Sequence, residues 1–165
     1  VNKRVESTIK LTRNSSADLP LSYASESFFP LDGLGWNDQA YDGSGELHNF
    51  FFTSHVSIPF YHSTGVQNQT FEFAGDDDVW VFIDDSLVLD LGGVHGIVKG
   101  AVDIQNLGLG EGIYTMDIFH AERKPTGSNF KIYTNMQLCN HSLSSPPPPS
   151  SPPTAPPPTA PPPVS

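Results

Sequence analysis

Cysteine is almost absent from this sequence, which holds a single one, Cys139, in 165 residues. One cysteine can form no disulfide within the chain, and it excludes a zinc site built on two or more cysteines. Long apolar runs are also missing. No stretch of about 18 apolar residues occurs, so the sequence predicts no membrane-spanning segment. The chain starts with valine and shows no signal-peptide core, which is typical of a mature or trimmed fragment.

Basic residues are scarce: 8 Lys and Arg stand against 18 Asp and Glu, which gives a net charge of -10. Nucleic-acid binding needs clustered Lys and Arg, so this balance argues against a nucleic acid and against an anionic membrane surface. It suits divalent cations or neutral polar partners such as sugars. The plain alternative is that the acidity only keeps the protein soluble.

Helical periodicity is nearly absent, and short strand-like runs recur between turn signals. The continuously apolar run Val79–Ile83 is typical of a strand buried on both faces, and Trp80 within it is expected in the core. Asp84-Asp85-Ser86 predicts a tight hairpin turn. Segment 13–48 has poor periodicity and is expected to be a long insertion, packed by Phe28, Phe29, Leu31 and Trp36. The other expected strands are Arg4–Thr12, Asn49–Phe60, Gln69–Ala74, Ser86–Leu91, Gly100–Ile104, Gly112–Ala121 and Phe130–Leu138. Strands of this length and spacing predict an all-β sandwich or barrel.

The C-terminal part, residues 144–165, has a different composition. Twelve of the 16 prolines follow Ser145, and every charged residue precedes it. Such a segment can form neither a helix nor a strand ladder, and it is disordered or adopts polyproline II. The sequence therefore predicts a globular domain over 1–143 and a stalk over 144–165. At about 3.1 Å per residue the stalk would be roughly 60 Å long.

Three consecutive carboxylates, Asp76, Asp77 and Asp78, join two of the expected strands. Like charges side by side are unfavourable unless a cation neutralises them, and Ca²⁺ takes hard oxygen ligands of this kind. The spacing is not that of an EF-hand. Adjacent side chains point apart along a regular strand, so convergence on one ion needs an unusual backbone such as a cis peptide. The alternative is three solvated aspartates in a turn.

The stretch GDDDVWVFIDDSLVLDLGGVHG, followed by FHAERKPTGSNFKIYTN, resembles the fibro-slime family, a branch of the protective-antigen (PA-14) lectin-like domains. Phe29–Gly33 and His48–Thr53 also fit earlier blocks of that family. The resemblance implies an antiparallel β-sandwich of the PA-14-like jelly-roll type. It also implies an extracellular setting and, as in many members, sugar binding through Ca²⁺.

The resemblance further implies roles for individual residues. In lectin members two adjacent aspartates, joined by a cis peptide, hold the ion, and these positions fall on Asp76 and Asp77. A later loop supplies an asparagine side chain, here Asn129, together with backbone carbonyls. Asp78 stands where many relatives have glycine and is either a third ligand or solvated. The rest of the implied ligand loop is Thr126, Gly127 and Ser128.

A few side chains are candidates for glycan contact or for support of the site. Trp36 and Tyr41 lie in the expected insertion, as exposed contacts or as part of its packing. His95 follows a strand in a glycine-rich turn and either reaches the site or makes structural hydrogen bonds, because Ca²⁺ rarely takes imidazole nitrogen. His120 and Glu122 end a strand beside the ligand loop, and the sequence favours solvated polar residues over a supporting role there.

Several features favour a secreted protein. Three N-x-[ST] sequons occur, at Asn14, Asn68 and Asn140. In an oxidising compartment, Cys139 would pair with another chain. The tail resembles the Ser-Pro₄ units of extensins, the hydroxyproline-rich wall glycoproteins. That resemblance implies hydroxylation and O-glycosylation at Pro146, Pro147, Pro148, Pro149, Pro152, Pro153, Pro156, Pro157 and Pro158.

These features predict an extracellular, calcium-dependent carbohydrate-binding or adhesion module of a cell-wall, matrix or flagellar-surface glycoprotein. Its expected partners are extracellular glycans or other glycoproteins, with self-assembly open. No nucleophile elbow, phosphate loop or His-rich metal motif occurs, and adjacent aspartates do not stand across a cleft as glycosidase carboxylates do, so no enzyme is expected. The alternative is a structural subunit of a glycoprotein fibre or matrix, in which calcium only stiffens the loops.

Overall fold

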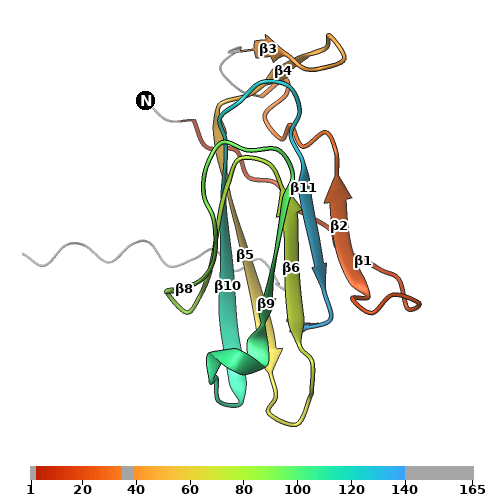
Figure 1. The fold of residues 1–165 in the computed structure, drawn as a ribbon, viewed down its shortest axis with the longest axis vertical. Coiled ribbons are helices and arrows are strands. Elements are labelled where there is room, and N and C mark those ends of the chain that lie inside the picture. Colours follow the sequence, from red (N-terminus) through yellow and green to blue (C-terminus); the bar gives the residue numbers. More distant parts are fainter. Residues whose placement is uncertain (1–2, 35–38, 140–165) are drawn as a thin grey trace, which may run out of the picture.

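The computed structural model describes residues 3–34 and 39–139, and it shows a β-sandwich of two five-stranded sheets with a small two-stranded hairpin at one end (Figure 1). All strand pairs are antiparallel. The antiparallel sandwich predicted from the sequence is therefore confirmed. Within the described residues the one helix is the short 3-10 turn η1 (Ile104–Leu107), and no helix is long and apolar enough to cross a membrane.

The first sheet has the order β1-β2-β11-β6-β9. Its strands are β1 (Thr12–Arg13), β2 (Leu21–Ser25), β11 (Phe130–Thr134), β6 (Thr70–Gly75) and β9 (Val98–Asp103). The second sheet has the order β12-β5-β10-β7-β8. Its strands are β12 (Gln137–Leu138), β5 (Phe52–His62), β10 (Gly112–Glu122), β7 (Asp78–Ile83) and β8 (Ser86–Leu91). The hairpin consists of β3 (Gln39–Tyr41) and β4 (Leu47–Asn49).

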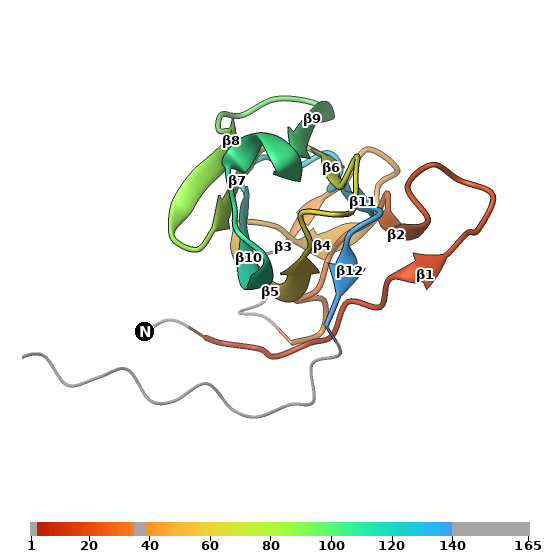
Figure 2. The ribbon, with the colours of Figure 1, turned by 90° about the horizontal axis from the view of Figure 1, so that it is seen from below.

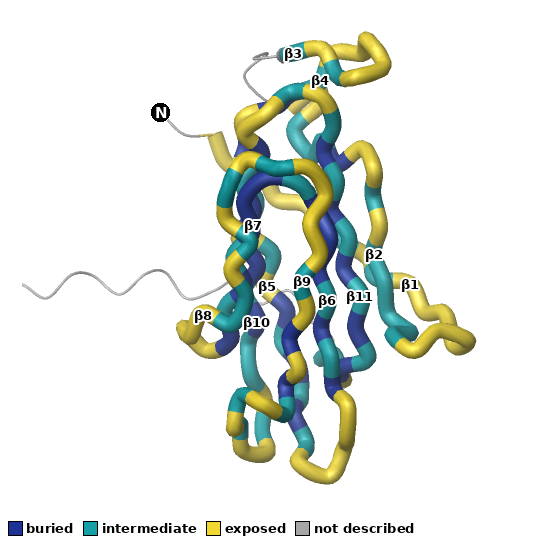
Figure 3. Tube along the Cα trace, viewed as in Figure 1, coloured by how far each residue is buried: buried dark blue, intermediate teal, exposed yellow. Residues whose placement is uncertain are grey.

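The core lies between the two sheets, as the view along the strands shows (Figure 2). Successive side chains of a strand point to opposite faces, so alternate residues enter the core. Phe71 and Phe73 of β6 and Phe130 of β11 are fully buried and face Val79 and Val81 of β7 in one continuous cluster. Full burial of each such side chain contributes about 1.5–3 kcal/mol relative to its exposure. Buried segments therefore run through the middle of the sandwich and exposed ones along its loops (Figure 3).

The turn between β7 and β8 confirms the predicted hairpin. Ile83 pairs with Ser86, which leaves Asp84 and Asp85 as a two-residue loop. Their φ angles are 45° and 64°. Positive φ at both central positions is the requirement of the type I′ turn, whose twist matches that of the flanking strands. Aspartate accepts this left-handed conformation more readily than most residues.

Other expectations about the strands are wrong in detail. Segment 13–48 is not an unstructured insertion: it contains β2, which pairs with β11 inside the first sheet. Of the expected strand Arg4–Thr12, only Thr12 is in a strand, although Ile9 and Leu11 pack against the core.

Two further corrections concern the sheets themselves. Trp80 is not a core residue, because only Val79, Val81 and Ile83 of β7 face inward, and Trp80 is half-buried on the outer face. The expected strand Phe130–Leu138 is two strands, and the chain crosses from the first sheet to the second between Thr134 and Gln137.

Candidate functional site at the acidic turn

One end of the sandwich gathers four connections, at the top of Figure 1. They are the acidic turn between β6 and β7, loop 92–97 between β8 and β9, loop 123–129 between β10 and β11, and the β3–β4 hairpin. Main-chain hydrogen bonds join them. Asp77 N–H donates to the His95 carbonyl at 3.4 Å, and Gly43 N–H of the hairpin donates to the Thr126 carbonyl at 3.1 Å. The fold therefore brings together the two segments that the resemblance paired, Asp76–Asp78 and Thr126–Asn129.

Asp76 and Asn129 form the direct contact between these segments. The Asp76 Oδ1 accepts the main-chain N–H of Asn129, and its Oδ2 accepts the Asn129 Nδ2 amide at 2.7 Å. Because Nδ2 is the donor, the amide oxygen of Asn129 is left for another partner. It accepts no hydrogen bond from any residue in the described ranges. A carboxylate and an amide oxygen thus lie side by side at the surface of the turn.

Asp77 is the most buried of the three aspartates, with 1% of its surface exposed. Its Oδ2 accepts the main-chain N–H of Arg123 at 2.7 Å, and its Oδ1 accepts that of His95 at 3.3 Å. The unusual backbone expected at this turn is present as a positive φ of 54° at Asp77. The cis peptide implied by the resemblance is not found, since every peptide bond of the described ranges is trans. The positive φ lets neighbouring carboxylates leave the alternation of a regular strand.

Asp78 faces a different partner. Both of its oxygens are engaged by the guanidinium of Arg123, Oδ2 by Nε and Oδ1 by an Nη atom at 2.9 Å, and Oδ1 also accepts the Gly93 N–H at 2.7 Å. Burial alone would raise the pKa of Asp78, but the bonds from Arg123 and Gly93 hold it below its ordinary value. Asp78 is thus neither solvated nor free as a ligand. Arg123 was not singled out from the sequence, although a carboxylate starting a buried strand signals the need for a cation.

Beneath the turn lies a small set of buried polar side chains, His120, Glu122 and Ser128. The sequence favoured solvated residues at His120 and Glu122, and this is wrong, because each is only 1% exposed. Burial raises the pKa of Glu122 to about 7, with repulsion from Asp77 and Asp76 adding to it. Burial lowers the pKa of His120, which favours the neutral ring. Three buried atoms, His120 Nε2, Glu122 Oε2 and Ser128 Oγ, lack a hydrogen-bond partner among the described residues.

The arrangement can bind a hard cation only with mixed ligands. Within residues 3–34 and 39–139, no three His, Cys, Asp or Glu side chains are placed to hold a metal ion by themselves. Asp76 and Asp77 with the amide oxygen of Asn129 and loop carbonyls form an oxygen set of the kind Ca²⁺ prefers. The local charge also favours a cation, since three carboxylates lie together here and the Arg123 guanidinium pairs with one of them, Asp78.

The residues predicted for glycan contact, glycosylation and an intermolecular disulfide lie in different parts of the chain. Both ring nitrogens of His95 lie near carbonyl oxygens, Nε2 at 2.9 Å from Leu91 O and Nδ1 at 2.8 Å from Gly96 O. Those contacts raise its pKa and leave the ring no nitrogen for a ligand.

Tyr41 is 66% exposed on the hairpin beside the acidic turn. Trp36, Asn140 and all the tail prolines lie outside the described residues. Asn14 and Asn68 are exposed, and Cys139, a free cysteine, donates its N–H to the Pro59 carbonyl.

Comparison with known proteins identifies the family. The model of the PA14 domain matches residues 64–149, about half of the chain, and this range contains the acidic turn and the ligand loop. The chain belongs to the PA14 domain family. PA14 domains are mostly carbohydrate-binding or adhesion modules, although some PA14 proteins are enzymes, and they are typically extracellular or at the cell surface. The assignment to the fibro-slime branch and the extensin-like character of the tail stay predictions.

Among curated proteins, the chain is similar to psi proteins of Dictyostelium discoideum. It is 39% identical to psiR over 145 residues, 37% to psiQ over 147 and 41% to psiF over 149. These alignments cover 82%, 84% and 76% of the chain. The chain spans only 14%, 15% and 21% of the lengths of those proteins. No solved structure gives a significant match.

Proposed function

We propose that this PA14 domain is an extracellular, non-enzymatic, calcium-dependent module that binds carbohydrate at the end of the sandwich carrying the acidic turn. It would belong to a cell-wall, matrix or flagellar-surface glycoprotein. One observation carries the proposal. Asp76, next to Asp77 in the acidic turn, contacts Asn129 from a distant loop, and the Asn129 amide oxygen accepts no hydrogen bond within residues 3–34 and 39–139.

Asp76, Asp77 and Asn129 would hold the ion, completed by carbonyls of Thr126–Ser128. A bound Ca²⁺ supplies oxygen coordination that sugar hydroxyls can complete. The protein's own contribution is to fix the ligands. Asn129 orients Asp76, and the N–H groups of Arg123 and His95 orient Asp77. Asp78 takes no part in the proposed ligand set, because its oxygens already face the positively charged guanidinium of Arg123, whereas those of Asp76 and Asp77 accept only uncharged N–H groups.

The rim of this end offers contact surface for a glycan. Tyr41 on the hairpin and Phe51 just before β5 are 66% and 61% exposed, and Val94 in loop 92–97 is 52% exposed. Aromatic faces stack on the apolar faces of sugar rings, whereas carboxylates and amides bond their hydroxyls. Tyr41 is therefore the proposed glycan contact. His95 is assigned the structural role that its hydrogen bonds indicate.

The experiment has two arms. Titration calorimetry of the purified chain with CaCl₂ tests the ion, and a glycan array read with and without a chelator tests the sugar. Calcium binding that is lost in Asp76→Ala and Asp77→Ala, together with chelator-sensitive glycan signals, supports the proposal. An array with no chelator-sensitive signal would contradict carbohydrate binding, and a flat titration would contradict the ion.

One observation favours the structural alternative as a second candidate. Every hydrogen bond to Asp76 and Asp77 ties one loop to another, so an ion here could serve only to stiffen the end of the sandwich. In that case the domain would be a subunit of a glycoprotein fibre or matrix. Calcium-dependent stability without any glycan signal, with self-association that survives Asp76→Ala plus Asp77→Ala, would favour this candidate.

A further inference from the structure

A row of aromatic rings crosses the outer face of the second sheet. His55 of β5, Phe119 of β10 and Trp80 of β7 are direct cross-strand neighbours. The rings of His55 and Phe119 stack at 4.5 Å with an interplanar angle of 3°, and Phe82 meets Phe119 edge-on at 5.8 Å. These four residues all point away from the core, since their neighbours in sequence are the ones that enter it. We call them the aromatic row.

The aromatic row is open to solvent over part of its length. Phe119 is 41% exposed, and the His55 side chain is 51% exposed. Trp80 and Phe82 are half-buried. The indole N–H of Trp80 donates no hydrogen bond to any of residues 3–34 and 39–139. The row therefore offers aromatic faces with a hydrogen-bond donor beside them, which is the combination that proline-rich segments in the polyproline II conformation recognise.

The chain's own proline-rich segment starts at the edge of this same sheet. β12 pairs with β5 in the register Gln137↔Tyr61 and Leu138↔Phe60, and the Cys139 N–H continues the ladder to the Pro59 carbonyl. Because β12 runs antiparallel to β5, the chain leaves it in the direction from Pro59 toward His55. The edge of the sheet thus points the following residues at the aromatic row.

The lengths agree. Cys139 lies one strand outside Pro59, so the row is four strand residues along the sheet, about 13 Å, and two strand spacings of about 4.8 Å across for Phe119 or three for Trp80. Ser145 is six residue steps beyond Cys139, and at about 3.1–3.4 Å a step an extended chain spans roughly 20 Å. The Pro146–Pro149 run is therefore the first proline cluster that reaches the row. Residues 143–165 carry no charge, so docking there would bury no charged group of the tail.

We propose that Pro146–Pro149 dock on the aromatic row of the same molecule, with proline rings on Phe119 and Trp80 and a main-chain carbonyl accepting the Trp80 indole N–H. The covalent connection favours this occupant over a free ligand, because a segment joined to its site through a few residues of the same chain has an effective concentration on the order of millimolar. Docking fixes the direction in which the stalk leaves the domain. The stalk then cannot pivot freely about Cys139, and the acidic-turn end is held in a defined orientation to whatever carries the stalk.

The test uses the full 165-residue chain made in bacteria, where the prolines stay unmodified. Trp36→Phe makes Trp80 the single tryptophan, since the chain has two. Serine replaces Pro146–Pro149 in one variant and Pro156, Pro157, Pro158 and Pro161 in a matched control. We expect acrylamide quenching of Trp80 to rise about twofold in the first variant alone, because a docked proline ring covers one face of the indole. Equal quenching in the parent and both variants would overturn the proposal.

A second readout follows the tail itself. The backbone order parameter of Ser145 is expected above about 0.6 in the parent and below it in Phe119→Ala, as for a released segment. Ile113→Ala is the control, because Ile113 lies on the same face of β10, is 70% exposed and is outside the row. An order parameter that Phe119→Ala leaves unchanged would contradict docking. Protection of Trp80 that grows with protein concentration would mean that the tail of a second copy binds, which contradicts docking within one molecule.

Discussion

Asp76 accepts both the main-chain N–H and the side-chain amide of Asn129, a residue 53 positions further along the chain. This pair closes the acidic turn onto the end of loop 123–129. It also leaves the Asn129 amide oxygen beside the carboxylate without a hydrogen-bond donor among the described residues. The Asn129 amide therefore has two separable functions. Its nitrogen holds loop 123–129 to the acidic turn, and its oxygen is the proposed calcium ligand.

Asn129→Ala separates these functions. We expect calcium affinity to fall at least about tenfold, which corresponds to about 1.4 kcal/mol. In chelator, the free energy of unfolding should fall by only about 0.5–1.5 kcal/mol, the usual contribution of one hydrogen bond. Asn106→Ala is the matched control, because Asn106 Nδ2 makes the same kind of bond to Asp103 Oδ2 at 3.0 Å, away from the acidic turn. Equal calcium binding by the two variants would contradict the ligand role of Asn129.

Arg123 is expected to be essential for stability because it is the counter-ion of Asp78. Arg123→Met leaves a carboxylate whose side chain is 6% exposed without its cation, and the melting temperature should fall by roughly 5 °C or more. Arg123→Lys should recover part of that loss, since lysine supplies the charge without the two-pronged geometry.

Lys131→Met provides the comparison for Arg123. Lys131 pairs with Glu26, whose side chain is 80% exposed, and exposed ion pairs contribute little. Differential scanning fluorimetry measures all three variants. A melting temperature that falls equally in Lys131→Met and Arg123→Met would show that the burial of Asp78 is unimportant.

Glu122 predicts a pH dependence of stability in the calcium-free protein. Its pKa is raised from 4.5 to about 7 by burial, so the folded state binds a proton that the unfolded state has lost. The free energy of unfolding should therefore decrease as the pH rises from about 4.5 to about 7, and level off above that. Urea denaturation at several pH values in chelator measures this slope. Glu122→Gln, which stays neutral, should flatten it, and an unchanged slope would assign the dependence to other groups.

The Asp84–Asp85 turn predicts opposite effects of two substitutions. Asp85 has a φ of 64°, which glycine adopts freely and a β-branched residue does not. Asp85→Gly should leave the stability equal or slightly higher, whereas Asp85→Val should lower it by about 1–2 kcal/mol. Ser86→Val, one residue later at the start of β8, should be tolerated because β-branched residues suit strands. Chemical denaturation of the three variants gives the comparison.

Short apolar runs between turn signals were enough to predict β6, β7, β8 and β10 and the turn at Asp84 and Asp85. Each depends on residues close in sequence: the period of two in a strand and the turn chemistry of aspartate. The same local information predicted wrongly at β2 and at Trp80. The Leu21–Ser25 segment becomes a strand because β11 pairs with it. The run Val79–Ile83 is apolar at every position, so the sequence alone does not show that only one face of this strand enters the core.

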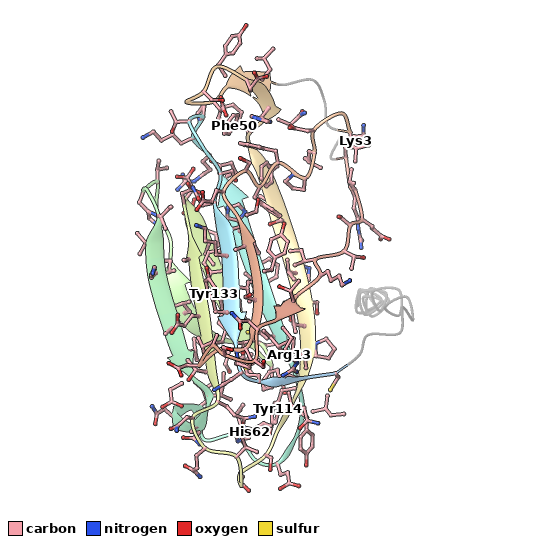
Figure 4. The ribbon with its side chains drawn as sticks, turned by 90° about the vertical axis from the view of Figure 1, so that its right-hand side faces the viewer. Lys3, Arg13, Phe50, His62, Tyr114 and Tyr133 are labelled. Atoms are coloured by element: carbon pink, nitrogen blue, oxygen red, sulfur yellow. The ribbon has the colours of Figure 1, made fainter. Side chains whose placement is uncertain are left out.

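The ends of the sandwich at which individual side chains lie also follow from the fold and not from the local sequence (Figure 4). His62 and Tyr114 lie at one end and Phe50 at the other, and nothing near them in the sequence assigns them to those ends. The sequence by itself determined the strand-forming segments, the acidic character of the β6–β7 turn and, through resemblance, its pairing with Asn129. Only the tertiary structure decided that Arg123 neutralises Asp78, that Glu122 is buried, and that β12 pairs with β5 at the edge of the second sheet. Those facts depend on sheet order, because residues distant in sequence become neighbours only when the strands between them have taken their places.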